Sequence, residues 1–136
     1  MNKKFEVRIF TPFGKYLSTE CDYLSTKTSD GVIGILPNHA PLIATLDISK
    51  LIIKNNNSTY LYAISGGVIH IKKDHSVTLL LNSIERSDEI DVNRAKAAQK
   101  RAEDRINNKD LDYNEIQRAK VSLLRALNRI DISDNK

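Results

Sequence analysis

The chain has 136 residues, of which 21 are Lys or Arg and 17 are Asp or Glu, giving a formal net charge of +4. This length suits one domain of ordinary size, or a small domain with an appendage. No apolar run approaches the roughly 20 residues that a membrane-spanning helix needs and no signal peptide is evident, and the modest charge lacks the strongly basic footprint of a nucleic-acid-binding protein.

The first part of the chain carries a β-strand pattern. Apolar residues alternate with polar ones, or form short clusters between turn residues, from Phe5 to Asn82. Nine short strands are predicted, at about 5–10, 16–19, 22–28, 32–36, 42–46, 49–54, 59–65, 67–72 and 76–82. Strands at this spacing indicate an all-β sandwich or flattened barrel. Gly66-Gly67 falls within a strand pair, where we expect a β-bulge.

Between residues 88 and 95 the apolar period changes to that of a helix, and residues 88–136 contain no Gly or Pro. Asp91 is the expected N-cap of a helix that continues to about Ile106. The segment 107–111 breaks this helix, and Asp112 with Glu115 begins a second one in the manner of a capping box. The fold prediction is therefore a β-sandwich domain over residues 1–87, followed by an antiparallel two-helix hairpin over residues 88–136.

The two helices have narrow apolar stripes rich in small side chains. The first stripe consists of Ala95, Ala98, Ala102 and Ile106, and the second of Ile116, Ala119, Leu123, either Ala126 or Leu127, and Ile130. Small residues allow helices to approach closely but bury little area, worth only a few kcal/mol at roughly 25 cal/mol per Å². We therefore expect a hairpin that is marginally stable alone and able to open.

Arginines recur at helical spacing on both predicted helices. Arg94, Arg101 and Arg105 share one face of the first helix, and Arg118, Arg125 and Arg129 share one face of the second. In an antiparallel hairpin Arg94 and Arg101 are expected near Arg129 and Arg125, where the guanidinium groups repel one another unless an anion lies among them. The alternative is that these arginines are solvated or paired with Glu103, Asp104 and Asp91.

Other chemistry has little support in the sequence. The three histidines are scattered: His70 points outward from a strand, His75 lies in a hairpin loop, and His39 sits on a loop between two prolines. They form no metal-ligand set, and no serine or cysteine has a base nearby in sequence. The single cysteine, Cys21, is expected to be a small buried hydrophobe in a reducing compartment. We therefore do not expect an enzyme.

Three motifs resemble those of one known family, the epsilon subunit of the rotary F-type ATP synthase. The segment 31–42, Gly-Val-Ile-Gly-Ile-Leu-Pro-Asn-His-Ala-Pro-Leu, is similar to that family's signature loop, and Ser65-Gly66-Gly67-Val68 is similar to its later strand motif. The segment 90–95, Ile-Asp-Val-Asn-Arg-Ala, resembles its nucleotide-binding motif. The resemblance extends from Phe5 to about Ile132, with the same order of strands and helices.

The resemblance implies a non-catalytic subunit of the central stalk. Its β-sandwich would dock on the gamma shaft and the c-subunit rotor ring, and its hairpin would switch between a folded and an extended form. When extended, the hairpin would reach the catalytic alpha/beta head and block ATP hydrolysis, while bound ATP would favour the folded form. The regulatory ATP site carried over by motif consists of Glu85, Ile90, Asp91, Arg94, Ala95, Arg101, Arg125 and Arg129.

The resemblance also implies partner contacts. His39 and Val32 would face the rotor ring, although many relatives have a charged residue where this chain has Val32. Arg118 and Lys120 would meet acidic surface on the catalytic head when the hairpin is extended. The expected location is peripheral, at the cytoplasmic face of a bacterial membrane, with the plastid thylakoid membrane as the lesser possibility. ATP is the one ligand implied, and no metal.

Two other functions remain compatible with the sequence. One is a purely structural coupling subunit without a working nucleotide site, because the motif does not fix the affinity for ATP. The other is a β-sandwich adaptor whose basic helix pair contacts nucleic acid, an interpretation that the low net charge disfavours. Salt-dependent retention on DNA would distinguish the adaptor from the stalk subunit.

Overall fold

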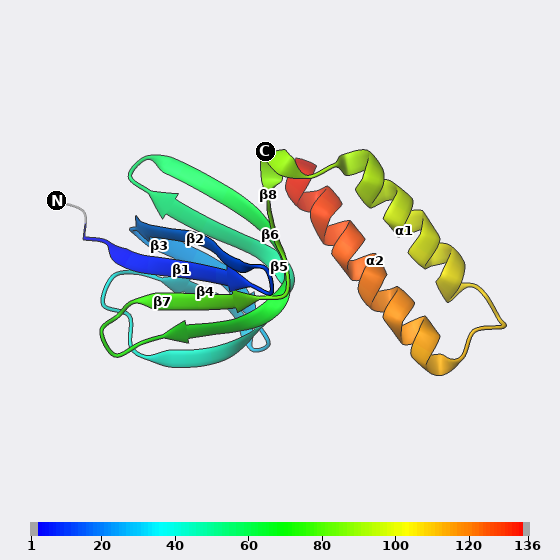
Figure 1. The fold of residues 1–136 in the computed structure, drawn as a ribbon, viewed down its shortest axis with the longest axis horizontal. Helices are drawn as coiled ribbons and strands as arrows, with labels where there is room; N and C mark the ends of the chain where they lie inside the picture. Colours follow the sequence, from blue (N-terminus) through cyan, green and yellow to red (C-terminus); the bar gives the residue numbers. More distant parts are fainter. Residues whose placement is uncertain (1–2, 135–136) are drawn as a thin grey trace. The chain divides into compact units, whose positions relative to one another are not determined.

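The computed structural model describes residues 3–134 of the chain, which separates into two compact units between Arg86 and Ser87. The first unit is built from β-strands and the second from helices, in the order expected for a sandwich followed by a hairpin (Figure 1). The fold class predicted from the sequence is confirmed.

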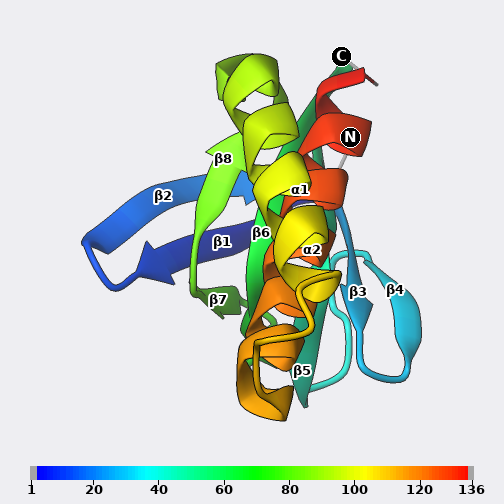
Figure 2. The same cartoon turned by 90° about the vertical axis from the view of Figure 1, so that its right-hand side faces the viewer.

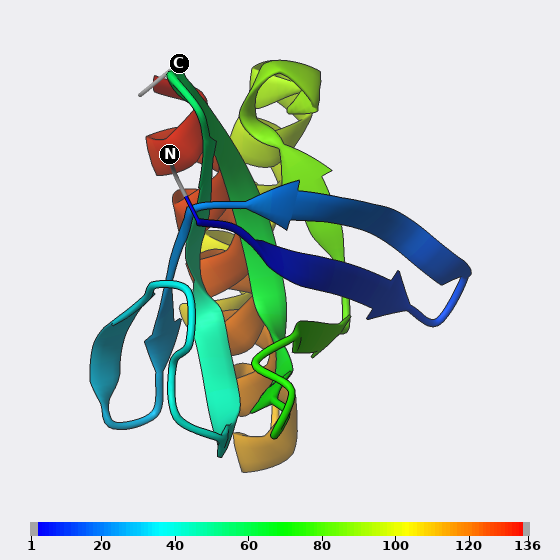
Figure 3. The same cartoon turned by 90° about the vertical axis from the view of Figure 1, so that its left-hand side faces the viewer.

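The β-unit contains eight strands: β1 (Phe5–Thr11), β2 (Gly14–Cys21), β3 (Tyr23–Thr28), β4 (Gly31–Ile35), β5 (Leu42–Asn55), β6 (Ser58–Ile71), β7 (Val77–Leu81) and β8 (Ile84–Arg86). Their hydrogen-bonded order is β2-β1-β7-β6-β5-β3-β4, and β8 pairs with β6. Figures 2 and 3 show the β1–β2 hairpin and the β3–β4 hairpin on opposite sides of the two long strands β5 and β6.

The prediction of nine short strands is wrong in two places. The segments 42–46 and 49–54 form one strand, β5, and the segments 59–65 and 67–72 form β6. The pairing of these two strands keeps one register from Leu42↔Ile71 to Asn55↔Ser58. The polar and glycine residues near their centres therefore bend the strands without ending them. The short strand β8 is not among the predicted strands.

The bend replaces the β-bulge expected at Gly66-Gly67, because the register of β5 and β6 does not shift there. Gly66 and Gly67 instead adopt φ values of +103° and +149°, which residues other than glycine rarely adopt. The buried positions of β6 change parity across them, from Ile64 before the bend to Ile69 after it. One strand can thus serve both layers of the sandwich, pairing with β8 before the bend and with β7 after it.

The core of the β-unit is aliphatic and closely follows the alternation in the sequence. Its fully buried large side chains come from six of the eight strands: Val7, Ile9, Leu24, Ile35, Leu51, Ile53, Ile64, Ile69, Ile71, Val77 and Leu79. Burial of such side chains stabilises a fold by roughly 1.5–3 kcal/mol each relative to exposure. The core therefore gives the unit a rigid frame from which its loops project.

The helical unit consists of a short 3-10 helix η1 (Ser87–Glu89), α1 (Val92–Ile106) and α2 (Tyr113–Asp134). Figures 1 and 2 show α1 and α2 side by side and antiparallel. The carboxylate of Asp91 caps α1 by accepting from the Arg94 amide at 3.1 Å, and Asp112 accepts from the Glu115 amide at 2.8 Å. Both predicted helix starts are confirmed. In the described part of the chain, neither helix has the length and apolar character that crossing a membrane requires.

The two helices contact each other through alanines. The four alanines with the least exposure are Ala95, Ala102, Ala119 and Ala126. Of the two alternatives for the second stripe, Ala126 is buried, whereas Leu127 is 42% exposed. The predicted stripe of small residues is confirmed, and it lets the helix backbones approach closely while burying little apolar area.

Strand β3 contains two buried threonines whose hydroxyl groups differ in their hydrogen bonding. The Oγ1 atom of Thr26 is buried without a hydrogen-bond partner among the described residues, whereas the Oγ1 atom of Thr28 donates to the Gly31 carbonyl and accepts from the Asp30 amide. We expect Thr26→Val to raise the free energy of unfolding by about 1 kcal/mol, because it removes an unpaired buried hydroxyl.

The matched control is Thr28→Val on the same strand. It should lower the free energy of unfolding by about 1–3 kcal/mol, because the Asp30 amide and the Gly31 carbonyl each lose a partner. Urea denaturation of the two variants measures both changes. Equal destabilisation by the two substitutions would contradict the conclusion that the Thr28 hydroxyl is hydrogen-bonded while the Thr26 hydroxyl is not.

Candidate functional site

The helical unit has a hollow lined by basic side chains. It lies between α1 and α2 and has a volume of about 370 Å³, within the range of roughly 300–1,000 Å³ typical of small-molecule sites. Three guanidinium-bearing residues line it, Arg101 and Arg105 from α1 and Arg118 from α2. Its remaining lining residues are Ala98, Ala102, Ala119 and Ser122. The small alanines leave the space, and the arginines provide its charge.

The arginines of the hollow are not neutralised within the described chain. Among residues 3–134, Arg101, Arg105 and Arg118 make no ion pair. The alternative of pairing with Glu103, Asp104 or Asp91 is therefore not observed for these three arginines. Like charges gathered around one hollow repel one another, and an anion bound there would relieve this repulsion.

The sequence predicts this cluster only in part. Arg101 lies in the hollow as part of the predicted ATP site, and Arg118, assigned from the resemblance to the catalytic head, lies beside it. Arg105 shares a helix face with Arg101 but is not part of the site that the motif predicts. At about 100° per residue, Arg94 and Arg125 extend the same faces along α1 and α2, although they do not line the hollow.

The other residues of the predicted site have different surroundings. The side chains of Ile90 and Ala95 are buried, with 5% and 0% exposure, and Asp91 caps α1 with its carboxylate. Arg129 is half-buried on α2 and has a polar interaction of its own. Glu85 is half-buried in β8 and belongs to the β-unit.

The loop that resembles the family signature projects from the β-unit between β4 and β5. Val32 on β4 is 72% exposed, Leu36 is 61% exposed, and Ile43 at the start of β5 is 69% exposed. The ring of His39 is half-buried, and its Nδ1–H donates to the Ala40 carbonyl at 2.8 Å. Exposed apolar side chains around a polar loop tip are typical of a protein–protein contact.

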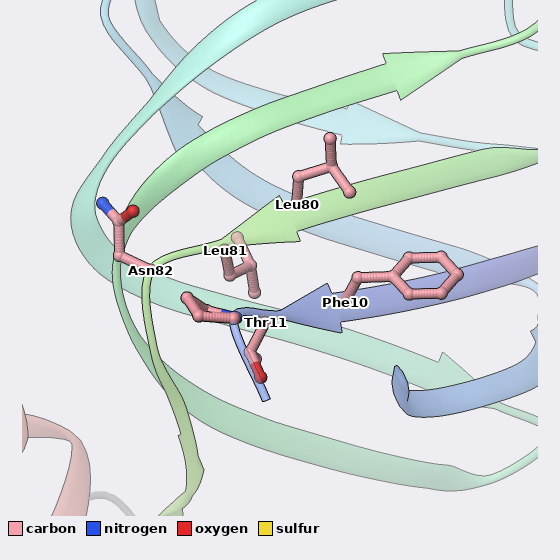
Figure 4. Close-up of a pocket in the computed structure, with 6 residues that line it drawn as sticks. Phe10, Thr11, Leu80, Leu81 and Asn82 are labelled. Carbon is pink, nitrogen blue, oxygen red and sulfur yellow. The ribbon is translucent and has the colours of Figure 1, made fainter. Parts of the chain in front are cut away.

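A second exposed apolar surface lies on the outer face of β1, β7 and β6. Phe10, Leu80 and Val68 are cross-strand neighbours there, and Leu80 and Val68 are 54% and 38% exposed. Figure 4 shows Phe10 and Leu80 on adjacent strands, beside a hollow of about 220 Å³ that Thr11 and Asn82 help to line. This surface is not among the sites predicted from the sequence, although the run Leu79-Leu80-Leu81 necessarily turns one leucine outward from a strand.

The remaining candidate groups have structural surroundings. Cys21 is fully buried, and desolvation raises the pKa of its thiol to about 12, so the reactive thiolate is scarce at neutral pH. The prediction of a buried, unreactive cysteine agrees with this placement. His70 points outward from β6, as expected, and no group of three or more His, Cys, Asp or Glu among residues 3–134 is placed to hold a metal ion.

Both units match known protein families. Residues 4–87 match the family described as ATP synthase, Delta/Epsilon chain, beta-sandwich domain. Residues 88–134 match the family described as ATP synthase, Delta/Epsilon chain, long alpha-helix domain. Together the two matches cover nearly the whole chain.

Individual relatives agree with these matches. The ATP synthase epsilon chain of Bacillus velezensis is 40% identical over 133 residues, covering 98% of this chain and 99% of the relative. That of Bacillus cytotoxicus is 41% identical over 134 residues, with the same two coverages. A chain in the structure of the Euglena gracilis mitochondrial ATP synthase, comprising OSCP, F1 and c-ring, has a TM-score of 0.79 at 18% identity, covering 89% of this chain and 76% of that one.

Proposed function

The chain belongs to the ATP synthase delta/epsilon family as an epsilon-type, non-catalytic subunit of the central stalk, and from this premise we propose that it couples the rotor and restrains ATP hydrolysis. The β-unit would hold the subunit on the rotor, and the helical hairpin would act as an ATP-sensitive brake. The proposed location is the cytoplasmic face of a bacterial membrane, where the subunit is peripheral.

We propose two docking surfaces on the β-unit. The outer face with Phe10, Leu80 and Val68 is suited to the gamma subunit, because it presents a continuous apolar row on a rigid sheet. The loop with His39, together with the exposed Val32, would contact the c-subunit ring. The valine makes this contact more apolar than in relatives with a charged residue there.

The proposal of an ATP-sensitive brake rests on the hollow between α1 and α2. Its three arginines make no ion pair within residues 3–134. A triphosphate has the charge and the oxygen acceptors that guanidinium groups bind best. We propose that Arg101, Arg105 and Arg118 contact the phosphates, and that Arg94, Arg125 and Arg129 extend the same basic surface. In this proposal Ile90, Asp91 and Ala95 form the helix start next to which the adenosine binds.

The proposed brake is a two-state element that ATP biases. The closed hairpin buries mainly alanines and gathers like charges, so its intrinsic stability is low. Bound ATP stabilises the closed form by RT ln(1 + [L]/Kd), provided that it does not bind the open form. When ATP is scarce, α2 is released, and Arg118 and Lys120 become available to acidic side chains of the catalytic alpha/beta head.

Calorimetric titration of ATP into the full-length chain tests the nucleotide site. We expect saturable binding of one ATP, accompanied by slower amide exchange in α1 and α2. If no heat and no protection were found at millimolar ATP, the purely structural coupling subunit would be the better interpretation. Salt-sensitive retention on DNA would instead favour the nucleic-acid adaptor.

Removal of the hairpin tests the brake. A chain truncated after Arg86 keeps the complete β-unit, because the chain divides at this point. We expect the cognate enzyme assembled with residues 1–86 to hydrolyse ATP several-fold faster than the enzyme with the full chain at low ATP. Assembly of both enzymes is checked by co-purification of the subunit. Equal hydrolysis rates with equal subunit content would show that the hairpin is not the brake.

A further inference from the structure

His75 stands out because it adopts a left-handed backbone conformation and binds a loop far from it in sequence. Its φ is +71°, which is uncommon for a residue other than glycine. The turn that imposes this conformation closes through two backbone bonds of 2.9 Å, from the His75 amide to the Lys72 carbonyl and from the Lys72 amide to the Ser76 carbonyl. The Asp74 carboxylate also accepts from the amide and the hydroxyl of Ser76.

The His75 ring reaches the loop between β4 and β5. Its Nδ1–H donates to the carbonyl oxygen of His39 at 3.0 Å, across 36 positions of sequence. Among the described residues, this is the one hydrogen bond that joins residues 36–41 to another part of the chain, since the bond of the His39 ring to Ala40 stays within the loop. The loop is therefore attached to the turn after β6 through a single imidazole.

Close packing on the rest of the chain does not hold residues 36–41 in place of this hydrogen bond. A polar hollow of about 230 Å³ lies beside the loop, lined by Asn38 from the loop, by Asp74 and His75 from the turn, and by Lys4 and Glu6 from the start of the chain. Asn38 itself has a φ of +68°. A loop beside a hollow depends on its tether more than a loop packed on the core does.

We infer that His75 is a positioning residue for rotor docking: it holds residues 36–41 in the conformation in which His39 meets the c-subunit ring. This inference rests on the proposed function, which assigns the loop to the ring. The carbonyl oxygen can only accept, so the imidazole must carry its proton on Nδ1. Both the neutral δ-tautomer and the cation do so, and the tether therefore holds in either charge state of His75.

Three substitutions at His75 separate the tether from the turn. They are His75→Gly, His75→Asn and His75→Asp, because glycine, asparagine and aspartate tolerate φ > 0 better than most residues. Glycine removes the donor. The Nδ2 atom of asparagine is bonded to Cγ, as Nδ1 is in histidine, so this variant keeps a donor in nearly the same place. Aspartate has the same size as asparagine but presents only acceptors.

The experiment measures amide hydrogen exchange at Asn38, His39 and Ala40, together with binding of the full-length chain to the cognate enzyme depleted of this subunit. We expect His75→Gly and His75→Asp to speed exchange in the loop and weaken binding, each about tenfold, and His75→Asn to restore both. Thr59→Ser, at the exposed start of β6, is the control and should change neither. The urea midpoint of each variant reports whether the fold is intact.

The outcomes separate this inference from the proposed function. If the wild-type chain binds the depleted enzyme and His75→Asp binds equally well with unchanged exchange, the positioning role is overturned. If His75→Gly lowers the urea midpoint, the comparison of His75→Asn with His75→Asp decides, since they differ only in donor and acceptor. If the wild-type chain itself does not bind the enzyme, the proposed function fails, while the exchange rates still report on the tether.

Discussion

Replacing Gly67 with alanine should destabilise the β-unit more than any other single methyl addition to a glycine of this chain. A Cβ atom at Gly67 would lie 2.1 Å from the carbonyl oxygen of Leu80 and 2.9 Å from the Cα of Leu81. Both contacts are with backbone atoms of β7, which cannot move aside as the end of a flexible side chain can. The residue also has a φ of +149°. We expect a loss of about 3–5 kcal/mol in the free energy of unfolding.

Urea denaturation of Gly67→Ala measures this loss, and Gly14→Ala is the matched control. Gly14 also has a positive φ, +112°, but a Cβ there would meet no atom within 4 Å. The control therefore carries the backbone strain without the clash, and should cost about 1–2 kcal/mol. Similar losses in the two variants would mean that β6 and β7 do not approach as closely at Gly67 as the structure has them.

The second large effect is expected in nucleotide binding. Arg101→Ala and Arg118→Ala should each weaken ATP binding to the full-length chain by about 10- to 100-fold, because hydrogen bonds to charged groups are worth about 1.5–3 kcal/mol. Arg125→Ala should weaken binding as well, since Arg125 follows Arg118 by seven residues on the same face of α2. Isothermal titration calorimetry gives the three dissociation constants.

The control for charge is Lys100→Ala. Lys100 is exposed and precedes Arg101, so at about 100° per residue its side chain leaves α1 well away from the hollow. It removes the same net charge as the arginine variants but should change the affinity less than about threefold. If Lys100→Ala and Arg101→Ala weakened binding equally, general electrostatic attraction would explain the effect, and the hollow would lose its assigned role.

Much of the fold could be predicted from local patterns. Phe5, Val7 and Ile9 alternate with polar residues, and all three are buried in β1. Asp91 and Asp112 are the expected helix starts, and both accept the hydrogen bond of an amide three residues later. These features are local, because capping and alternation involve residues close together in the sequence. The resemblance of residues 31–42 and 90–95 to family motifs supplied the function that such patterns do not give.

The long strands show where local patterns failed. Asp47 and Gly66 fall between predicted strands, since polar residues and glycines often end a strand. They mark a bend instead, because the ladder of β5 and β6 continues past them in one register. Whether a glycine ends a strand or bends it depends on the neighbouring strand, here the backbone of β7 at Leu80.

The sequence by itself determined the order of the elements, the helix caps and the small-residue stripes, because each follows from the periodicity of side chains within a few turns or residues. Only the tertiary structure decided which arginines surround the hollow, and that Ala126 rather than Leu127 is buried, because both depend on the rotation of one helix against the other. It also decided that His75 tethers the loop at His39, a contact between segments that no local pattern links.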